Sequence, residues 1–252
     1  MATEGRLADE APAGDEKFVV YEGIELEKVV IIGRTFEEYS RMFLLDEIPA
    51  DGRKILDAAG GVSSFTKEAS DRGWQVMSLD PVYCHGLDAL KEKCSKDLDH
   101  LLDLVVSKKH LFRWEKPHET VDEIRDLRTR AYTTFLGDFQ VNRYRYFDAM
   151  LPHTPYIADN NFKTTLMSHL LFAYGQFLGY ETHLAIFKEL VRVTSEELRF
   201  FPLLDCNTLE QLPHLERLKR EPALSGLEFK IHDVPYEFLK GTGRMLVVKK
   251  PG

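Results

Sequence analysis

The sequence predicts an α/β fold in which a doubly wound, mostly parallel sheet carries helices on both faces. Strand and helix patterns alternate along most of the chain, and residues 54–80 contain one complete strand–helix–strand unit. The last two predicted strands, 227–234 and 244–249, are separated only by Pro235–Gly243. That connection is too short for a crossover helix, so these strands should form an antiparallel hairpin.

Length and composition favour one domain and disfavour several classes of partner. The chain has 252 residues, of which 44% are hydrophobic, enough for a full core. Its net charge of −8 argues against nucleic acid as a partner. Three cysteines do not make a disulfide framework and fit a reducing compartment. We see no signal peptide and no membrane-spanning apolar run, so we expect a cytoplasmic protein with no membrane partner.

The N-terminal region predicts a tail followed by a capped helix. Residues 1–16 are rich in Ala, Gly, Glu and Asp without an apolar period, and we expect a disordered tail there. Residues 17–252 are expected to form a single domain. Thr35 and Glu38 have the spacing of a capping box, which predicts a helix over 36–45. Such a helix lies either over the ligand pocket or against the core as a cap.

The strand–helix–strand unit is built to hold a nucleotide-like ligand. A strand at 54–59 is followed by a turn of small residues, a helix at 64–72 and a second strand at 75–79 that ends in Asp80. Small residues let the backbone approach a ligand, and the N-terminus of the helix offers unpaired N–H groups. Asp80 follows the turn by about 20 residues, where an acid accepts hydrogen bonds from a ribose diol.

An unusually long helical stretch follows. Apolar residues recur at steps of three and four over 85–140, with a break at 108–117. This stretch exceeds the helix that normally links two parallel strands, so we predict a helical lid inserted in the domain. Its aromatic residues either pack in the core, which we favour for most of them, or form the wall of a substrate pocket: Phe112, Trp114, Tyr132, Phe135 and Phe139.

The rest of the chain continues the alternation. The patterns predict strands at 143–149, 162–167 and 198–204, and helices at 178–193 and 212–219. Ser168 and His169 follow the middle one of these strands. The carboxyl ends of strands open onto the ligand crevice of such sheets, which makes His169 the candidate catalytic base. The alternative is a histidine that only forms part of the pocket wall.

The order of these elements and motifs resembles a class I S-adenosylmethionine-dependent methyltransferase of the small-molecule, type-11-like branch. The resemblance covers about 53–250 and implies a Rossmann-like, seven-stranded sheet with a reversed last strand. The family's first motif, Asp-x-Gly-x-Gly-x-Gly, corresponds to residues 57–63, where Gly61 remains and Ala59 and Ser63 replace two glycines. A second departure is Lys163, where the family usually has an aspartate.

The resemblance also implies the cofactor, the acceptor and their contacts. The cofactor would be S-adenosylmethionine, and the partner a small-molecule methyl acceptor under the lid. Cofactor contacts are implied at the first motif and at the ends of the second, third and fourth strands: Asp57, Ala59, Gly60, Gly61, Ser63, Asp80, Pro81, Asp148, Ala149 and Ser168. Asp148 would lie near the adenine. Candidate substrate contacts are Arg34, Tyr39 and Tyr174; Arg34 could instead make a surface ion pair.

Three alternatives to an active methyltransferase fit the sequence less well. The altered glycine motif allows a methyltransferase-like binding protein without catalysis, although Asp80 and Asp148 argue against it. A nicotinamide-dependent oxidoreductase expects Gly-x-Gly-x-x-Gly, which is absent. A metal site is disfavoured because the spacing of four clustered residues matches no zinc pattern: Cys84, His85, Cys94 and His100.

Overall fold

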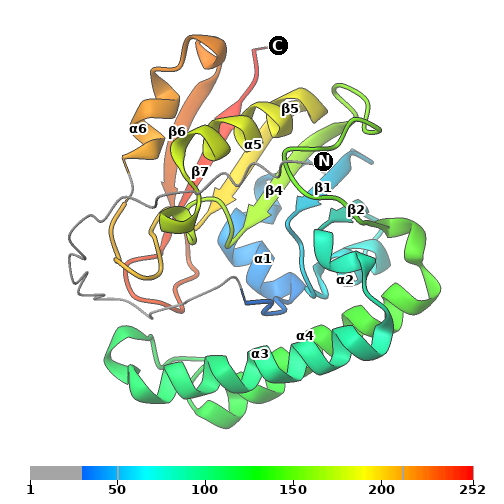
Figure 1. Ribbon diagram of the computed structural model, residues 1–252, viewed down its shortest axis with the longest axis vertical. Helices are drawn as coiled ribbons and strands as arrows, with labels where there is room; N and C mark the ends of the chain where they lie inside the picture. Colours follow the sequence, from blue (N-terminus) through cyan, green and yellow to red (C-terminus); the bar gives the residue numbers. More distant parts are fainter. Residues whose placement is uncertain (1–29, 50, 212, 252) are drawn as a thin grey trace, which may run out of the picture.

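The computed structural model describes residues 30–49, 51–211 and 213–251. The predicted tail, 1–16, lies outside these residues. At the centre is one seven-stranded sheet with the order β3-β2-β1-β4-β5-β7-β6 (Figure 1). The strands are β1 Lys54–Ala58, β2 Gln75–Leu79, β3 Tyr146–Phe147, β4 Phe162–Ser168, β5 Thr194–Phe201, β6 Glu228–Asp233 and β7 Arg244–Lys249.

The pairing of the strands confirms the predicted fold class. The strands β1 to β5 are mutually parallel, and β7 is antiparallel to both of its neighbours, β5 and β6. This is the Rossmann-like sheet with a reversed last strand that the resemblance to class I methyltransferases implies. The helices are α1 Phe36–Phe43, α2 Phe65–Asp71, α3 Leu87–Ser107, α4 Val121–Val141, α5 Tyr180–Val193 and α6 His214–Lys219.

The sheet is buried on both faces because alternate residues of its strands face different helices. In β1, Ile55 packs in the cluster that contains Tyr39 of α1 and Phe65 of α2. The next residue, Leu56, packs in the opposite cluster, which contains Phe187 of α5. Four consecutive apolar residues of β7 alternate between the two clusters in the same way.

The long helices α3 and α4 lie side by side across the end of the sheet at which the parallel strands finish (Figure 1). Of the aromatic residues in this stretch, Phe135 and Phe139 pack against Tyr83 and Tyr146 in a buried cluster. These two therefore belong to the core, and Phe112 is also buried in a core cluster while lining the cavity described below.

Two predicted strands differ from the structure by more than two residues. The strand predicted at 143–149 is reduced to Tyr146–Phe147, because Arg143–Arg145 forms a 3-10 turn whose arginine side chains bond to neighbouring groups. The strand predicted at 198–204 begins at Thr194 instead and ends at Phe201. Helix α5 passes directly into β5, where the Thr194 hydroxyl donates back to the Leu190 carbonyl and bonds to Thr165.

Candidate active site

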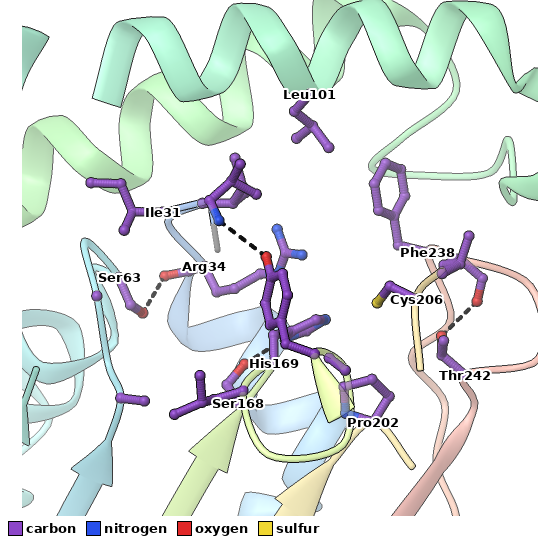
Figure 2. Close-up of a pocket in the computed structure, with 18 of the residues that line it drawn as sticks. Ile31, Arg34, Ser63, Leu101, Ser168, His169, Pro202, Cys206, Phe238 and Thr242 are labelled. Atoms are coloured by element: carbon purple, nitrogen blue, oxygen red, sulfur yellow. Dashed lines mark hydrogen bonds between the residues drawn. The ribbon is translucent and has the colours of Figure 1, made fainter. Parts of the chain in front are cut away.

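A cavity lies between the carboxyl ends of β1 and β4, the helix α3, and the connection that precedes β7 (Figure 2). In Figure 2, Leu101 points into the cavity from α3, with Arg34 and His169 across from it. Ten of the residues predicted for the site line this cavity: Arg34, Tyr39, Ala59, Gly60, Gly61, Ser63, Asp80, Ser168, His169 and Tyr174.

The turn after β1 keeps a tight conformation although two of the motif's glycines are replaced. Ala59 has φ of 58° and Gly61 has φ of 54°, both in the left-handed region. Gly60 has no room for a side chain: an added Cβ would lie 2.0 Å from the Ser78 hydroxyl and 2.4 Å from an Asp57 carboxylate oxygen. The turn therefore presents backbone to the cavity, and Ala59 bears a conformational cost of about 1–2 kcal/mol.

Asp80 both holds this turn and faces the cavity. Its Oδ2 accepts the backbone N–H of Gly61 at 3.0 Å, and its Oδ1 accepts the N–H of Val82 at 2.9 Å. Burial raises the pKa of Asp80, and the two N–H donors oppose that rise. Because each carboxylate oxygen has a second lone pair, Asp80 can still accept hydrogen bonds from a ligand.

Asp57 lies beneath the turn and does not line the cavity. Its Oδ1 accepts the hydroxyl of Tyr39 at 2.9 Å, and its Oδ2 is 3.3 Å from the Ser78 hydroxyl. Burial raises the pKa of Asp57 to about 7, although the hydrogen bonds from Tyr39 and Ser78 lower it. Its contribution to ligand binding would therefore act through Tyr39, which is on the cavity wall.

The segment before α1 closes over the first turn of α2. The carbonyl oxygen of Arg34 accepts the Ser63 hydroxyl at 2.7 Å and the Ser64 N–H at 3.0 Å. A side chain at Gly33 would meet the Val62 carbonyl at 2.7 Å, so a glycine is needed for this close approach. These contacts fix the Arg34 backbone at the rim, and its side chain extends toward the middle of the cavity (Figure 2).

His169 follows β4 directly and has φ of 51°. Its backbone N–H donates to the Phe201 carbonyl at 2.7 Å, and its ring Nδ1 is 2.7 Å from the Ser168 hydroxyl. Burial holds the pKa of His169 well below its usual value, and the charge of Arg34 lowers it further. The imidazole is therefore neutral at pH 7 and can accept a proton.

The remaining predicted residues occupy different places. Tyr174 is on the cavity wall, where its hydroxyl accepts the Val30 N–H at 3.3 Å. Pro81 and Asp148 are exposed and do not line the cavity. Ala149 is buried in the cluster under α5 and α6. Contacts to an adenine at Asp148 and Ala149 stay a prediction, since the cavity residues gather around the glycine turn, Asp80 and β4.

Sequence reasoning missed the wall that comes from residues 235–243, which it treated only as the connection of a hairpin. Tyr236, Phe238 and Thr242 from this connection line the cavity. The signal available was the pair of aromatic residues, two positions apart, in a segment that needed none. Cys206, which follows β5, was also missed.

A buried ion pair lies beside the cavity and bonds to Tyr236 of the cavity wall. Arg128 of α4 donates from Nη1 and Nη2 to the two carboxylate oxygens of Glu38, at 2.7 and 2.6 Å. The Tyr236 hydroxyl donates to Glu38 at 2.7 Å. Burial alone would raise the pKa of Glu38, but the Arg128 guanidinium holds that pKa well below its usual value. The pair joins α1, α4 and the connection before β7.

The described ranges contain neither a cluster of metal-ligating side chains nor a helix that could span a membrane. Within residues 30–49, 51–211 and 213–251, no three His, Cys, Asp or Glu side chains are arranged to hold a metal ion. None of the helices in those ranges has both the length and the apolar character needed to span a bilayer.

No protein-family model matches this chain. The chain is 36% identical over 231 residues to the uncharacterized protein MJ0045 of Methanocaldococcus jannaschii. The matched region covers 90% of this chain and 99% of that protein.

Several similar solved structures are described as methyltransferases. They include magnesium protoporphyrin IX methyltransferase from Synechocystis PCC 6803 with bound S-adenosylmethionine, at 12% identity and a TM-score of 0.45, covering 86% of this chain and 80% of that one. A TehB-like S-adenosylmethionine-dependent methyltransferase from Corynebacterium glutamicum has 16% identity and a TM-score of 0.45, covering 85% and 88%. At these scores the fold assignment rests on the strand order of the chain itself.

Proposed function

We propose that this chain, which belongs to the same protein family as the uncharacterized protein of Methanocaldococcus jannaschii, is an S-adenosylmethionine-dependent methyltransferase. The acceptor would be a small molecule bound between the strand ends and α3. The observation that carries the proposal is the tight turn after β1, which lines the cavity together with Asp80, the carboxylate that accepts the Gly61 N–H. In doubly wound sheets, nucleotide ligands bind at such turns, outside the carboxyl ends of the strands.

The residues present fit S-adenosylmethionine. Ala59, Gly60 and Gly61 line the cavity with backbone and at most a methyl group, and Asp80 retains lone pairs for the ribose hydroxyls. When bound, S-adenosylmethionine supplies an electrophilic methyl group on its sulfonium. The chain then needs only to align the acceptor and, for an O–H or S–H acceptor, to remove a proton.

His169 is proposed as the group that takes this proton. When its Nδ1–H donates to the Ser168 hydroxyl, Nε2 has a free lone pair and can act as a base. The Ser168 hydroxyl can then donate to the Met42 sulfur, which lies 3.9 Å away. Ser168 would therefore set the tautomer of the ring, while the neutral state of His169 follows from its burial.

Calorimetric titration of S-adenosylmethionine and S-adenosylhomocysteine tests the proposal, with NADH as the comparison ligand. Both sulfur nucleotides should bind the wild type and NADH should not. Asp80→Ala should weaken their binding by about 1.5–3 kcal/mol, the contribution of hydrogen bonds to a charged group. Asp88→Ala, an exposed position at the start of α3, is the matched control and should leave binding unchanged.

The possible outcomes separate the alternatives. Unchanged affinity in a folded Asp80→Ala variant would remove Asp80 from the site. Absence of binding in the wild type would overturn the proposed cofactor. A protein that binds both nucleotides but methylates none of a broad set of acceptors would support the non-catalytic binding protein instead.

A further inference from the structure

Arg34 is a buried arginine whose side chain has no hydrogen-bond partner among the described residues. Its side chain lines the cavity, and the residue is only 9% exposed. Two of its donors, Nε and Nη1, are shielded from solvent and have no hydrogen-bond partner in the described part of the chain. An unpaired buried guanidinium costs free energy, so its retention on a cavity wall calls for an anion that completes it.

Glu38, a buried carboxylate on which the charge of Arg34 acts, cannot serve as that anion. Glu38 is already bonded by both terminal nitrogens of Arg128, by the Tyr236 hydroxyl at 2.7 Å and by the Thr35 N–H at 2.9 Å. Burial lowers the pKa of both His169 and His118, so these rings are uncharged at pH 7. Glu38 and Arg128 neutralise each other, so the positive charge of Arg34 has no carboxylate of this cluster to pair with and suits an anionic group of a ligand.

The position of Arg34 indicates which half of the cavity this anion occupies. In Figure 2 the Arg34 side chain extends above His169, which follows β4, toward Cys206, which follows β5, and all three residues line the cavity. Burial lowers the pKa of His169, and the positive charge of Arg34 lowers that pKa further. The sheet order places β4 and β5 on one side of β1. Asp80 ends β2, on the other side of β1. Arg34 therefore acts in the half of the cavity away from the ribose-binding acid.

The same half of the cavity has an apolar wall. Leu101 and Leu104 project from α3, and Phe112, Phe238 and Leu239 come from the loops beside it. Figure 2 shows Leu101 and Phe238 facing the region into which Arg34 extends. A ligand that fits these surroundings has an apolar body and one anionic group.

We propose that the methyl acceptor is a carboxylic acid with an apolar body, whose carboxylate pairs with Arg34. This inference rests on the proposed methyltransferase function. A carboxylate suits the site because the guanidinium offers parallel N–H donors to its two oxygens, and because Nε and Nη1 of Arg34 have no partner among the described residues. The apolar body of the acid would lie against α3 and Phe238.

Binding of simple acids and their uncharged analogues tests the inference. Benzoate and hexanoate, with benzamide and hexanamide as analogues, are titrated into protein saturated with S-adenosylhomocysteine. The acids should bind the wild type, and the amides should bind at least about tenfold more weakly. Arg34→Gln should weaken the binding of the acids by about ten- to a hundredfold and leave the affinity for the amides unchanged. Arg34→Lys, which keeps the charge, should restore part of the affinity.

Two controls keep a structural role of Arg34 apart from pairing with an acid. Arg125→Gln, on the exposed side of α4, should leave all affinities unchanged. Thermal unfolding without ligand should show Arg34→Gln at least as stable as the wild type, since it removes an unpaired buried charge. The acids should raise the melting temperature of the wild type and not of Arg34→Gln.

The results that would overturn the inference are distinct from failure of the proposed function. If Arg34→Gln weakens the binding of S-adenosylhomocysteine and not the binding of the acids, Arg34 pairs with the carboxylate of the cofactor. If no acid binds the saturated wild type, the acceptor is not of this class, while the cofactor proposal stands. If S-adenosylhomocysteine itself does not bind, the proposed function fails, and titration of the acids alone still reports whether Arg34 holds a carboxylate.

Discussion

The Tyr39 hydroxyl donates a 2.9 Å hydrogen bond to Asp57, which joins the cavity wall to the floor beneath the glycine turn. The connection continues from Asp57 to Ser78 at 3.3 Å, from Ser78 to Tyr83 at 2.7 Å, and from the Tyr83 hydroxyl to the Gly61 carbonyl at 2.8 Å. A protonated Asp57 can donate to Ser78, which can then donate to Tyr83. Asp57 is therefore linked to the turn through the Ser78 and Tyr83 hydroxyls.

The raised pKa of Asp57 makes folding stability depend on pH. The pKa is about 7 in the folded protein, whereas the ordinary pKa of an aspartate is 3.8, so folding favours the protonated form. The stability from this group is fully present below pH 4 and is lost as the pH rises through 7. The loss amounts to about 4 kcal/mol. Urea unfolding of the wild type and Asp57→Asn between pH 4 and pH 8 measures it.

An asparagine side chain can still accept a hydrogen bond from Tyr39 but does not titrate. All other titratable groups contribute equally to the pH dependence of both proteins, so they drop out of the difference in unfolding free energy. The stability of Asp57→Asn relative to the wild type should therefore increase with pH over this range. A difference that stays constant from pH 4 to pH 8 would show that Asp57 is ionised in the folded protein throughout.

Ala59 adopts a backbone conformation that favours glycine. Its φ of 58° predicts that Ala59→Gly raises the free energy of unfolding by about 1 kcal/mol, because the gain in the folded state exceeds the entropy added to the unfolded chain. Ala58→Gly is the matched control, since Ala58 is fully buried in β1 and its loss should destabilise. Equal destabilisation by both variants would contradict the strained conformation.

His169 should matter for the rate and little for cofactor binding. His169→Asn, which tolerates the left-handed backbone, should lower kcat by about 10²–10⁴-fold if the acceptor must lose a proton. Because burial lowers the pKa of His169, its basic form persists below pH 6.5, and the rate should decline only at more acidic pH. The kcat of the wild type from pH 5 to pH 8 tests this.

Ser168→Ala should lower kcat less than His169→Asn does. It removes the hydroxyl that bonds to the His169 ring, so the ring can adopt either tautomer, but the base itself remains. His85→Asn, at an exposed histidine, serves as the control for the substitution itself. Full activity of His169→Asn would leave alignment of the reactants as the whole of the catalytic effect.

The pair formed by Arg128 and Glu38 should be strongly coupled. Arg128→Met leaves a buried carboxylate without its cation and should cost about 3–5 kcal/mol. Adding Glu38→Gln should recover part of that cost, by about 1–3 kcal/mol in a double-mutant cycle. Arg125→Met breaks an exposed ion pair with Asp99 and should change stability by less than about 1 kcal/mol. Additive effects at Arg128 and Glu38 would show that the pair does not act as a unit.

Local patterns in the sequence predicted most of the secondary structure and the strand directions. The capping box of Thr35 and Glu38 is present at the start of α1, and β2 and β7 have the predicted bounds. The other elements differ from their predicted bounds by at most two residues, apart from β3, β5 and the start of α4, which begins three residues later than predicted. Capping and apolar periodicity act between residues one or two turns apart, so the sequence contains them directly.

The tertiary structure decided what these residues do. Glu38 is a capping residue by sequence, yet its main partner, Arg128, is 90 positions away. Arg34 could have been a surface residue; it is a buried, unpaired charge because distant segments close around it. By itself, the sequence determined a mostly parallel, Rossmann-like sheet with a reversed last strand and a tight turn of small residues after β1. Which side chains share one cavity, and which charges stay unpaired, depended on packing between segments far apart in the chain, since burial and pairing are properties of those contacts.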